Sequence, residues 1–468
     1  MSQSDVKFAC SVLRKADNDS KKLAALLIVG KLFAERSIDE SDKSKIIKLI
    51  EYDFLLRLLN DYHGKLLVPM IDDGDNDNTS FCLDILVHFV SNIVQEYEYC
   101  ERFAEILGQI LLVHCTETEL AIYDEHVVDN VLICFQCFNT YLNCQSETQI
   151  NHLIEAYVNH VTKSYLLNVR NNNFKIETVL IHFSEHLEQQ HFDKFLNSIC
   201  GILSSYQTME KFKLCQLIKS LLRSKTHVKF SGTTHWSRHI YTALFEILKN
   251  RLSDQMRNDA LGLATQITIT FNGFDWIKQT SWNEDNSKHF ILLLRLVCIE
   301  MQLLITNYYG MGNNDNEKFG TFLILLEHLI LAFVSNLDEE KIDKKDQLQI
   351  GSETIFSSIK AIEETMSKVI EFIQVVAQDE LNEINVDTQN IIFGLIRLLC
   401  IYLNEETEAL RNELGNILPF IISLFMDKNL NKNELLQSIK PQVMSTIEQL
   451  SEDEILGEIV KKSTNQYK

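Results

Sequence analysis

The apolar positions of the chain recur at helical spacing almost from end to end. Between Phe290 and Leu304, apolar side chains stand at i, i+3, i+4, i+7, i+11 and i+14, and other apolar residues cover most of the remaining circumference. Such a helix has to be covered on several sides by other helices. Strict apolar/polar alternation is nearly absent, and its nearest instance, Gln266–Phe271, is interpreted as a helix end. The pattern predicts an all-α protein.

The apolar segments are separated by short polar connectors that begin new helices. Four stretches have the capping-box pattern, in which two side chains satisfy backbone N–H groups at a helix start: Ser37…Glu40, Thr116…Glu119, Ser146…Gln149 and Ser451…Glu454. The segments number roughly 16–18 helices of about 12–22 residues. A single core stops growing at about 250–300 residues, so helix pairs are expected to stack side by side. We predict an irregular armadillo/HEAT-like α-solenoid with a degenerate period of about 40–47 residues.

Three polar, mostly acidic segments are predicted to be longer loops, at residues 72–80, 307–318 and 338–346. None is long enough for a flexible linker between domains. We therefore predict one continuous solenoid over residues 1–468, with a bend near residue 310.

The composition supports this architecture and narrows the choice of partners. Only 3 Pro and 15 Gly occur in 468 residues, which is too little turn punctuation for a barrel or a sandwich. Lys and Arg total 44 against 65 Asp and Glu, which gives a net charge of −21. A surface this acidic repels nucleic acid and anionic membranes and favours basic protein segments.

The cysteines and the apolar runs point to a reducing compartment. The 11 cysteines are scattered without a disulfide framework, and no signal-like segment begins the sequence. The longest apolar stretch, Phe290–Ile305, is broken by polar residues and is shorter than a bilayer span. We expect a cytosolic protein with no transmembrane segment.

The stretch HFSEH places His182, Glu185 and His186 in the H-x-x-E-H pattern of one class of zinc peptidase. A zinc hydrolase also needs a third protein ligand and an open position for water. Apolar neighbours make the segment an ordinary amphipathic helix, so structural histidines are the favoured interpretation. A zinc metallohydrolase stays the alternative.

Two other clusters resemble metal sites. Cys134 and Cys137, with Cys144 beyond them, lie in an apolar helix where cysteine packs as a small hydrophobe. An acidic stretch imitates a calcium loop without its final Glu, and is interpreted as a solvated loop or, alternatively, a weak calcium site; its residues are Asp73, Asp75, Asp77, Asn78 and Asp84. No catalytic, metal or cofactor residues are assigned.

Two of the three tryptophans, Trp276 and Trp282, fall in one predicted loop. They would mark an interaction hot spot if exposed. The favoured interpretation is that they anchor the loop on the next helix.

Several collinear stretches between about residues 12 and 425 resemble the neurochondrin family. The residues that carry the resemblance are Asn18–Ser20, Ala24–Leu27, Val29, Lys31, Phe54, Arg57–Leu59, Lys211, Phe212, Leu214–Leu217, Leu252, Ser253, Arg257, Asn258, Ala260, Leu261, Leu263, Ala264, Asp275–Ile277, Ser287–Lys288, Cys298, Glu300, Leu403, Glu405–Thr407, Leu410, Arg411, Glu413 and Leu418–Phe420. The resemblance implies an armadillo-like fold and a non-enzymatic cytoplasmic scaffold without a cofactor. It also implies roles in neurite outgrowth and neuronal signalling, through binding of receptor cytoplasmic tails and restraint of calcium/calmodulin-dependent kinase phosphorylation.

Two departures from the family limit what carries over. Longer members have N-terminal cysteines proposed as acylation sites, whereas the first cysteine here is Cys10 in an apolar context, which speaks against a lipid anchor. The chain is also shorter and is expected to lack functions of the C-terminal portion. A karyopherin-like transport adaptor is a further alternative, because it shares the acidic solenoid. The binding face stays open.

Overall fold

The structure is a computed structural model of the chain. It describes residues 3–35, 40–66, 77–93, 97–115, 125–140, 147–167, 173–205, 209–225, 230, 234–308, 315–337, 347–377, 386–406, 410–426 and 433–465. Within these ranges every regular element is helical, and no strand occurs. The all-α prediction is confirmed.

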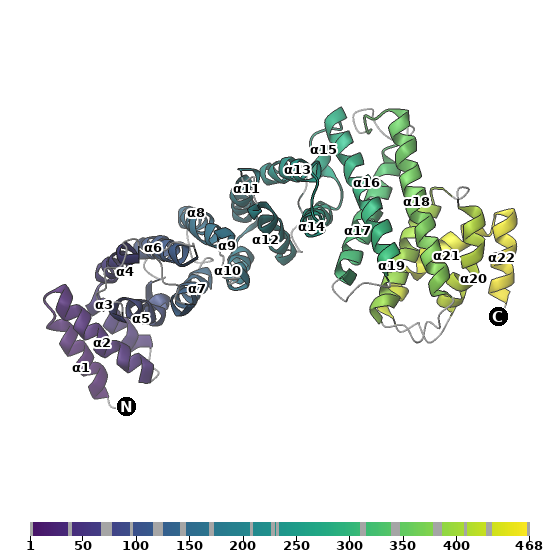
Figure 1. Cartoon of the computed structure of the whole chain (residues 1–468). Helices are drawn as coiled ribbons and strands as arrows, with labels where there is room; N and C mark the ends of the chain where they lie inside the picture. The colour runs from purple at the N-terminus through teal and green to yellow at the C-terminus, as the bar shows by residue number, and fades with distance from the viewer. Residues whose placement is uncertain are drawn as a thin grey trace. The chain divides into compact units, whose positions relative to one another are not determined.

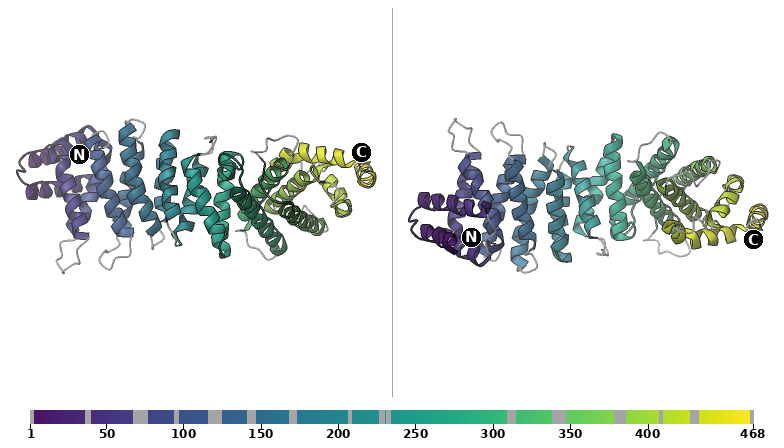
Figure 2. Two further views of the ribbon diagram at one scale, coloured as in Figure 1. Left: turned by 90° about the horizontal axis from the view of Figure 1, so that it is seen from above. Right: turned by 90° about the horizontal axis from the view of Figure 1, so that it is seen from below.

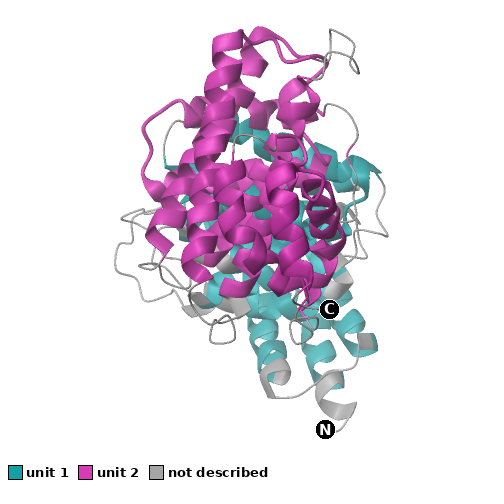
Figure 3. Cartoon of the chain, turned by 90° about the vertical axis from the view of Figure 1, so that its right-hand side faces the viewer, with its two compact units in different colours: residues 1–226 teal, residues 227–468 magenta. Residues whose placement is uncertain are grey.

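The chain divides into two compact units, Met1–Thr226 and His227–Lys468 (Figure 3). The elements of unit 1 are α1 (Gln3–Arg14), α2 (Asp19–Glu35), α3 (Glu40–Ile50), α4 (Tyr52–Leu66), α5 (Asp77–Ile93), α6 (Tyr97–Cys115), α7 (Glu125–Thr140), α8 (Glu147–Ala156), the π-helical η2 (Tyr157–Thr162), α9 (Lys163–Leu167), α10 (Asn173–His186), α11 (Gln189–Ser205) and α12 (Glu210–Ser224) (Figure 1). A continuous array over residues 1–468 stays a prediction.

The elements of unit 2 are α13 (His235–Leu248), α14 (Asp254–Phe271), α15 (Asp275–Lys278), α16 (Glu284–Asn307), α17 (Asp315–Ser335), α18 (Ser352–Val376), α19 (Val386–Leu403), α20 (Arg411–Met426), α21 (Glu434–Leu450) and α22 (Glu454–Asn465). The described residues thus form 22 α-helical segments, against the 16–18 helices predicted. Part of the difference arises because α8, η2 and α9 are consecutive pieces of one rod, and because α15 is only one turn.

Within each unit, a helix lies against the helix two places further along the chain as well as against its direct neighbour. In unit 2, α16 contacts α17 and α18, α17 contacts α19, and α19 contacts α21. Unit 1 repeats this arrangement with α4, α5, α6 and α7, and Figure 2 shows its helices side by side. This is the stacking of helix pairs that defines an α-solenoid, so the predicted fold class is confirmed.

Side-chain bonds between stacked helices measure the repeat directly. The bonds Asp84–His126, Lys175–Asp129 and Asn433–Asn390 join residues 42, 46 and 43 positions apart. These separations match the period of about 40–47 residues expected for HEAT and armadillo units. The Gln302–Thr365 and Arg397–Glu327 bonds span 63 and 70 positions, so the repeat is longer in that part of unit 2.

Helix ends differ from the predictions in two places. Ser451 does not cap α22; instead Asp453 Oδ1 accepts the backbone N–H groups of Ile455 at 2.9 Å and Leu456 at 3.0 Å. The carboxylate two residues later has the better reach, because it directly precedes the first helical residue. The predicted 307–318 loop is also too long: α17 already begins at Asp315, since a polar and acidic first turn complements the helix dipole.

The helix end predicted at QITITF is confirmed, whereas most of the other predicted loops and caps lie outside the described residues. QITITF ends α14 as expected, and Asn272 follows in the left-handed conformation with φ 52°. Residues 72–76 and 338–346 lie outside the described residues, as do the proposed caps Ser37, Thr116 and Ser146, while 77–80 begin α5.

Two helices of unit 2 are long and apolar enough to cross a membrane, Glu284–Asn307 and Asn316–Ser335. Their composition has another explanation, because both helices are packed against neighbours in the stack. A buried core helix passes the same test as a membrane span, so this is weak evidence for one.

The π-helical turn Tyr157–Thr162 lies against α6 at Gly108. A Cβ added to Gly108 would stand 2.6 Å from His160 Cβ and 2.9 Å from His160 Cγ. No real Cβ contact is that short, so the glycine permits this close approach of the two helices.

We predict that Gly108→Ala lowers the free energy of unfolding by about 1–3 kcal/mol, because the added methyl group overpacks this contact. Gly201→Ala in α11 is the matched control, since its Cβ would meet nothing within 4 Å. That control should gain about 0.5–1 kcal/mol from the better helix propensity of alanine. Urea denaturation measures both, and equal stabilities of the two variants would contradict the prediction.

Burial lowers the pKa of five histidines below the ordinary value of 6.5: His63, His88, His160, His186 and His289. His289, for example, stacks on Phe245 at 4.3 Å. An unfolded chain binds protons at these sites more readily than the folded chain does. Stability from these groups is therefore complete above pH 6.5 and falls as the pH drops from there toward the lowered pKa values.

We predict a lower melting temperature at pH 5.5 than at pH 7.5, and a smaller difference in His289→Phe, which keeps the stacked ring but cannot take up a proton. Thermal melts of both proteins at the two pH values measure the effect. An unchanged pH difference in the variant would mean that His289 does not contribute.

Candidate functional site

HFSEH forms the last turn of α10. His182 and His186 share one face, with their rings edge to face at 4.6 Å and their Nε2 atoms 3.2 Å apart. Glu185 is exposed. The backbone oxygens of Glu185 and Leu187 accept hydrogen bonds from Lys225 Nζ at 3.0 and 2.8 Å, so the motif ends a helix whose free carbonyls are capped.

His182 is the outer member of a buried polar chain. Tyr157 donates to Asn139 Oδ1 and lies 3.1 Å from the backbone oxygen of Phe135. Asn139 Nδ2 lies 3.3 Å from Val179 O and 3.3 Å from His182 Nδ1. Because Nδ2 is a donor, this network assigns Nδ1 of His182 as an acceptor and puts its proton on Nε2.

This assignment bears on the zinc hypothesis. The Nε2–H of His182 points to His186 Nε2, so the two rings are hydrogen-bonded to each other. Burial, reinforced by His182, lowers the pKa of His186. Nowhere in the described ranges do three His, Cys, Asp or Glu side chains gather to hold a metal ion. Within HFSEH, His182 therefore links α10 to Asn139 of α7, while Ser184 and the Glu185 backbone oxygen bond Ser224 and Lys225 at the end of α12.

The cysteine pair belongs to the same region. Cys134 is buried in α7, whereas Cys137 is partly exposed and burial raises the pKa of its thiol. Cys137 and His182 line one hollow of about 400 Å³ between α7 and α10, together with Ile133, Gln136 and Thr178. The sequence does not indicate that Cys137 and His182 lie near each other. Cys144 lies outside the described residues.

The structure describes part of the acidic stretch and both tryptophans. Asp73 and Asp75 lie outside the described residues, while Asp84 accepts a hydrogen bond from Asn130 at 2.6 Å. Trp276 and Trp282 are buried, so they are not an exposed hot spot.

Both tryptophans anchor the segment between α14 and α16. Trp276 Nε1 donates to Thr268 Oγ1 at 3.2 Å, and the ring of Trp282 meets Phe290 edge to face at 5.5 Å. Trp282 thus anchors the segment on the next helix, as predicted, whereas Trp276 lies in α15 and bonds to the preceding helix α14 instead.

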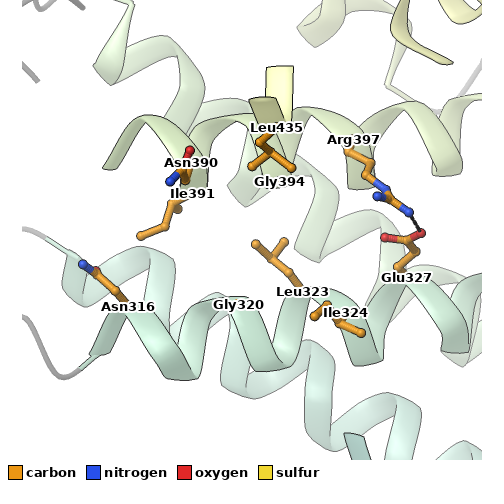
Figure 4. Close-up of a pocket in the computed structure, with 10 residues that line it drawn as sticks. All are labelled: Asn316, Gly320, Leu323, Ile324, Glu327, Asn390, Ile391, Gly394, Arg397 and Leu435. Carbon is orange, nitrogen blue, oxygen red and sulfur yellow. Dashed lines mark hydrogen bonds and ion pairs between the residues drawn. The ribbon is translucent and has the colours of Figure 1, made fainter. Parts of the chain in front are cut away.

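A second hollow, in unit 2, is a groove between α17 and α19 with α21 at its side. Its volume is about 400 Å³, and Figure 4 shows the residues that line it. We call it the α17–α19 groove; it is lined by Asn316, Gly320, Leu323, Ile324, Glu327, Asn390, Ile391, Gly394, Arg397 and Leu435.

The two helices run parallel along the groove. Gly394 faces Leu323, and one helical turn further Arg397 Nη2 pairs with Glu327 Oε1 at 2.5 Å. The middle of the groove is apolar, and Ile324 is 40% exposed although it lies on a packed helix. The ion pair closes one end, and Asn316 and Asn390 stand at the other (Figure 4).

Sequence reasoning missed this groove. The signal that could have pointed to it is the pair Gly320 and Gly394, each standing alone within a long apolar helix. A helical glycine without a turn or cap often marks a place where side-chain volume is missing for a packing or functional reason.

Comparison with known proteins places the chain among described relatives. A model of the neurochondrin family matches residues 2–446. Neurochondrin of Gallus gallus is 23% identical over 430 residues, covering 89% of this chain and 56% of that protein. Homo sapiens neurochondrin is 24% identical over 421 residues, covering 88% of this chain and 52% of that protein. The Drosophila melanogaster neurochondrin homolog is 21% identical over 457 residues, covering 93% of this chain and 57% of that protein.

The structural comparisons are more distant. Kap121p bound to Nup53p has a TM-score of 0.42 at 11% identity and covers 98% of this chain and 41% of that chain. Importin beta has a TM-score of 0.34 at 11% identity, with coverage of 99% and 59%. At these scores the fold assignment rests on the helix stacking itself.

The chain spans about half the length of the curated relatives it matches. The family model nevertheless extends over nearly all of it, from residue 2 to residue 446. The chain belongs to the neurochondrin family.

Proposed function

We propose that this chain is a non-enzymatic scaffold that binds segments of other proteins, and that these segments are basic. The observation that carries the proposal is the α17–α19 groove, an unfilled apolar hollow of about 400 Å³ on the helix stack. Exposed apolar hollows with polar ends are surfaces at which partner side chains bind. The net charge of −21 favours positively charged partners.

A stack of packed helices suits this role physically. Its helices are already ordered, so binding costs little conformational entropy on the scaffold side. Long-range attraction between the acidic scaffold and a basic segment speeds their encounter and weakens with salt.

Family membership supports a more specific version of the proposal. The chain would act in neurite outgrowth and neuronal signalling by binding receptor cytoplasmic tails and restraining phosphorylation by calcium/calmodulin-dependent kinase. It would do so in the cytosol of neurons and reach membranes through its partners. A karyopherin-like transport adaptor is the alternative within the same class, and cargo-dependent nuclear shuttling would distinguish it.

We predict that basic receptor-tail peptides bind the chain with an association rate that falls about tenfold or more between low and high salt, because screening removes the long-range attraction. Charge-reversed peptides of the same length are the control. Stopped-flow fluorescence measures the rates, and equal rates for both peptide sets would contradict the charge argument.

The zinc metallohydrolase alternative makes an opposite prediction. A non-enzymatic scaffold should carry far less than one zinc ion per chain, and His182→Ala should leave the metal content unchanged. Elemental analysis of both purified proteins decides the matter. Stoichiometric zinc that disappears in His182→Ala would favour the hydrolase.

A further inference from the structure

The α17–α19 groove owes its volume to a missing side chain. A Cβ added to Gly320 would meet no atom within 4 Å, whereas one added to Gly394 would stand 2.9 Å from Leu323 Cδ1. Gly394 therefore lies directly against the tip of the Leu323 side chain, and Gly320 leaves space unfilled beside that contact. The two glycines together produce a hollow with a tight base.

The groove residues contributed by α17 form a single stripe along one face of that helix. On α17 the lining residues are Asn316, Gly320, Leu323, Ile324 and Glu327, at i, i+4, i+7, i+8 and i+11. A stripe of this kind runs straight along the helix for about three turns, or about 16 Å. The groove is thus long enough for two turns of a helix and, at about 400 Å³, holds a few large apolar side chains.

The polar lining residues at the two ends of the α17–α19 groove carry no net charge, so they do not repel a ligand that has both charged and apolar groups. The Glu327 side chain is 16% exposed and that of Arg397 is 41% exposed, and they neutralise each other. Asn390 Oδ1 accepts from Asn433 Nδ2 at 3.3 Å. These groups limit the apolar surface to the middle of the groove.

Charges beside the groove favour a basic occupant. Glu317, in the first turn of α17, and Glu434, in the first turn of α21, are both exposed. The parallel course of α17, α19 and α21 places these first turns at the end marked by Asn316 and Asn390, since Asn433 contacts Asn390 there. Carboxylates at this end attract Lys or Arg side chains that flank an apolar anchor.

We propose that the α17–α19 groove is the docking site for an amphipathic helical segment of a partner protein, with apolar side chains at i, i+3 or i+4 and i+7 entering the hollow and flanking basic residues near Glu317 and Glu434. This inference rests on the proposed scaffold function and names its site and the chemistry of its partner. It follows the general mode in which a helix lays one apolar face into a groove.

The test uses a fluorescent synthetic helix of about 16 residues, with leucine at i, i+3, i+4 and i+7 and lysine and alanine elsewhere. A second peptide of equal charge has alanine in place of each leucine. Binding to the full chain is measured by fluorescence anisotropy. We expect the leucine peptide to bind at least about tenfold more tightly than the alanine peptide, because only leucine fills the hollow.

Gly320→Leu is the decisive variant, because its side chain fills the groove from within while meeting no atom within 4 Å at its Cβ. It should keep or raise the melting temperature, because leucine is a better helix former than glycine, and it should weaken binding of the leucine peptide about tenfold or more. Gly201→Leu, in α11 of unit 1, is the matched control: its Cβ would also be unobstructed, and its binding should equal that of the parent protein. Glu317→Lys combined with Glu434→Lys should weaken binding at low salt only.

The outcomes separate the two proposals. Equal binding of the leucine peptide to the parent protein and to Gly320→Leu would overturn the groove as the site, while leaving a basic-partner scaffold intact. Absence of binding by either peptide at low salt would overturn both. A dimer that dissociates in Gly320→Leu, seen by sedimentation, would instead assign the groove to a second copy of this chain.

Discussion

Burial of nearly continuous apolar helix surfaces is the constraint on which the rest of the structure depends. α16 buries Phe290, Leu294, Val297 and Met301, and that surface is covered because α17 and α18 both lie against it. Each such residue contributes on the order of 1.5–3 kcal/mol when fully buried. No single neighbour covers this much circumference, so each helix needs another two places along the chain, and stacking follows.

Hydrophobic burial is non-directional, so it does not fix how far one helix slides along the next. Polar bonds between stacked helices supply that register. Gln302 donates to Thr365 at 2.9 Å between α16 and α18, and Asn139 joins α7 to α10 in unit 1. The histidines of HFSEH belong to these polar bonds between helices, because His182 is hydrogen-bonded to Asn139 and His186 is hydrogen-bonded to His182. Residues that resemble a catalytic motif thus help to align two helices.

Much of the fold was predictable because it depends on local patterns. Helical spacing in residues 290–304 and the helix end at QITITF need only neighbouring residues, and the period follows from helix length. The groove and the hollow at Cys137 and His182 depend on which residues of different helices face each other, and a degenerate repeat does not reveal that register. The cap at Asp453 could not be predicted, because the S-x-x-E pattern places the capping residue at Ser451, two positions earlier.

Gly320 sets stability and binding against each other at a single position. Alanine is preferred over glycine in a helix by about 0.5–1 kcal/mol, and the surroundings of Gly320 would accept its methyl group. Selection for a more stable helix alone would therefore replace this glycine and begin to close the groove. A mutational screen for thermal stability in this protein should enrich substitutions at residue 320 that impair partner binding, so improved stability there would be a warning of lost function.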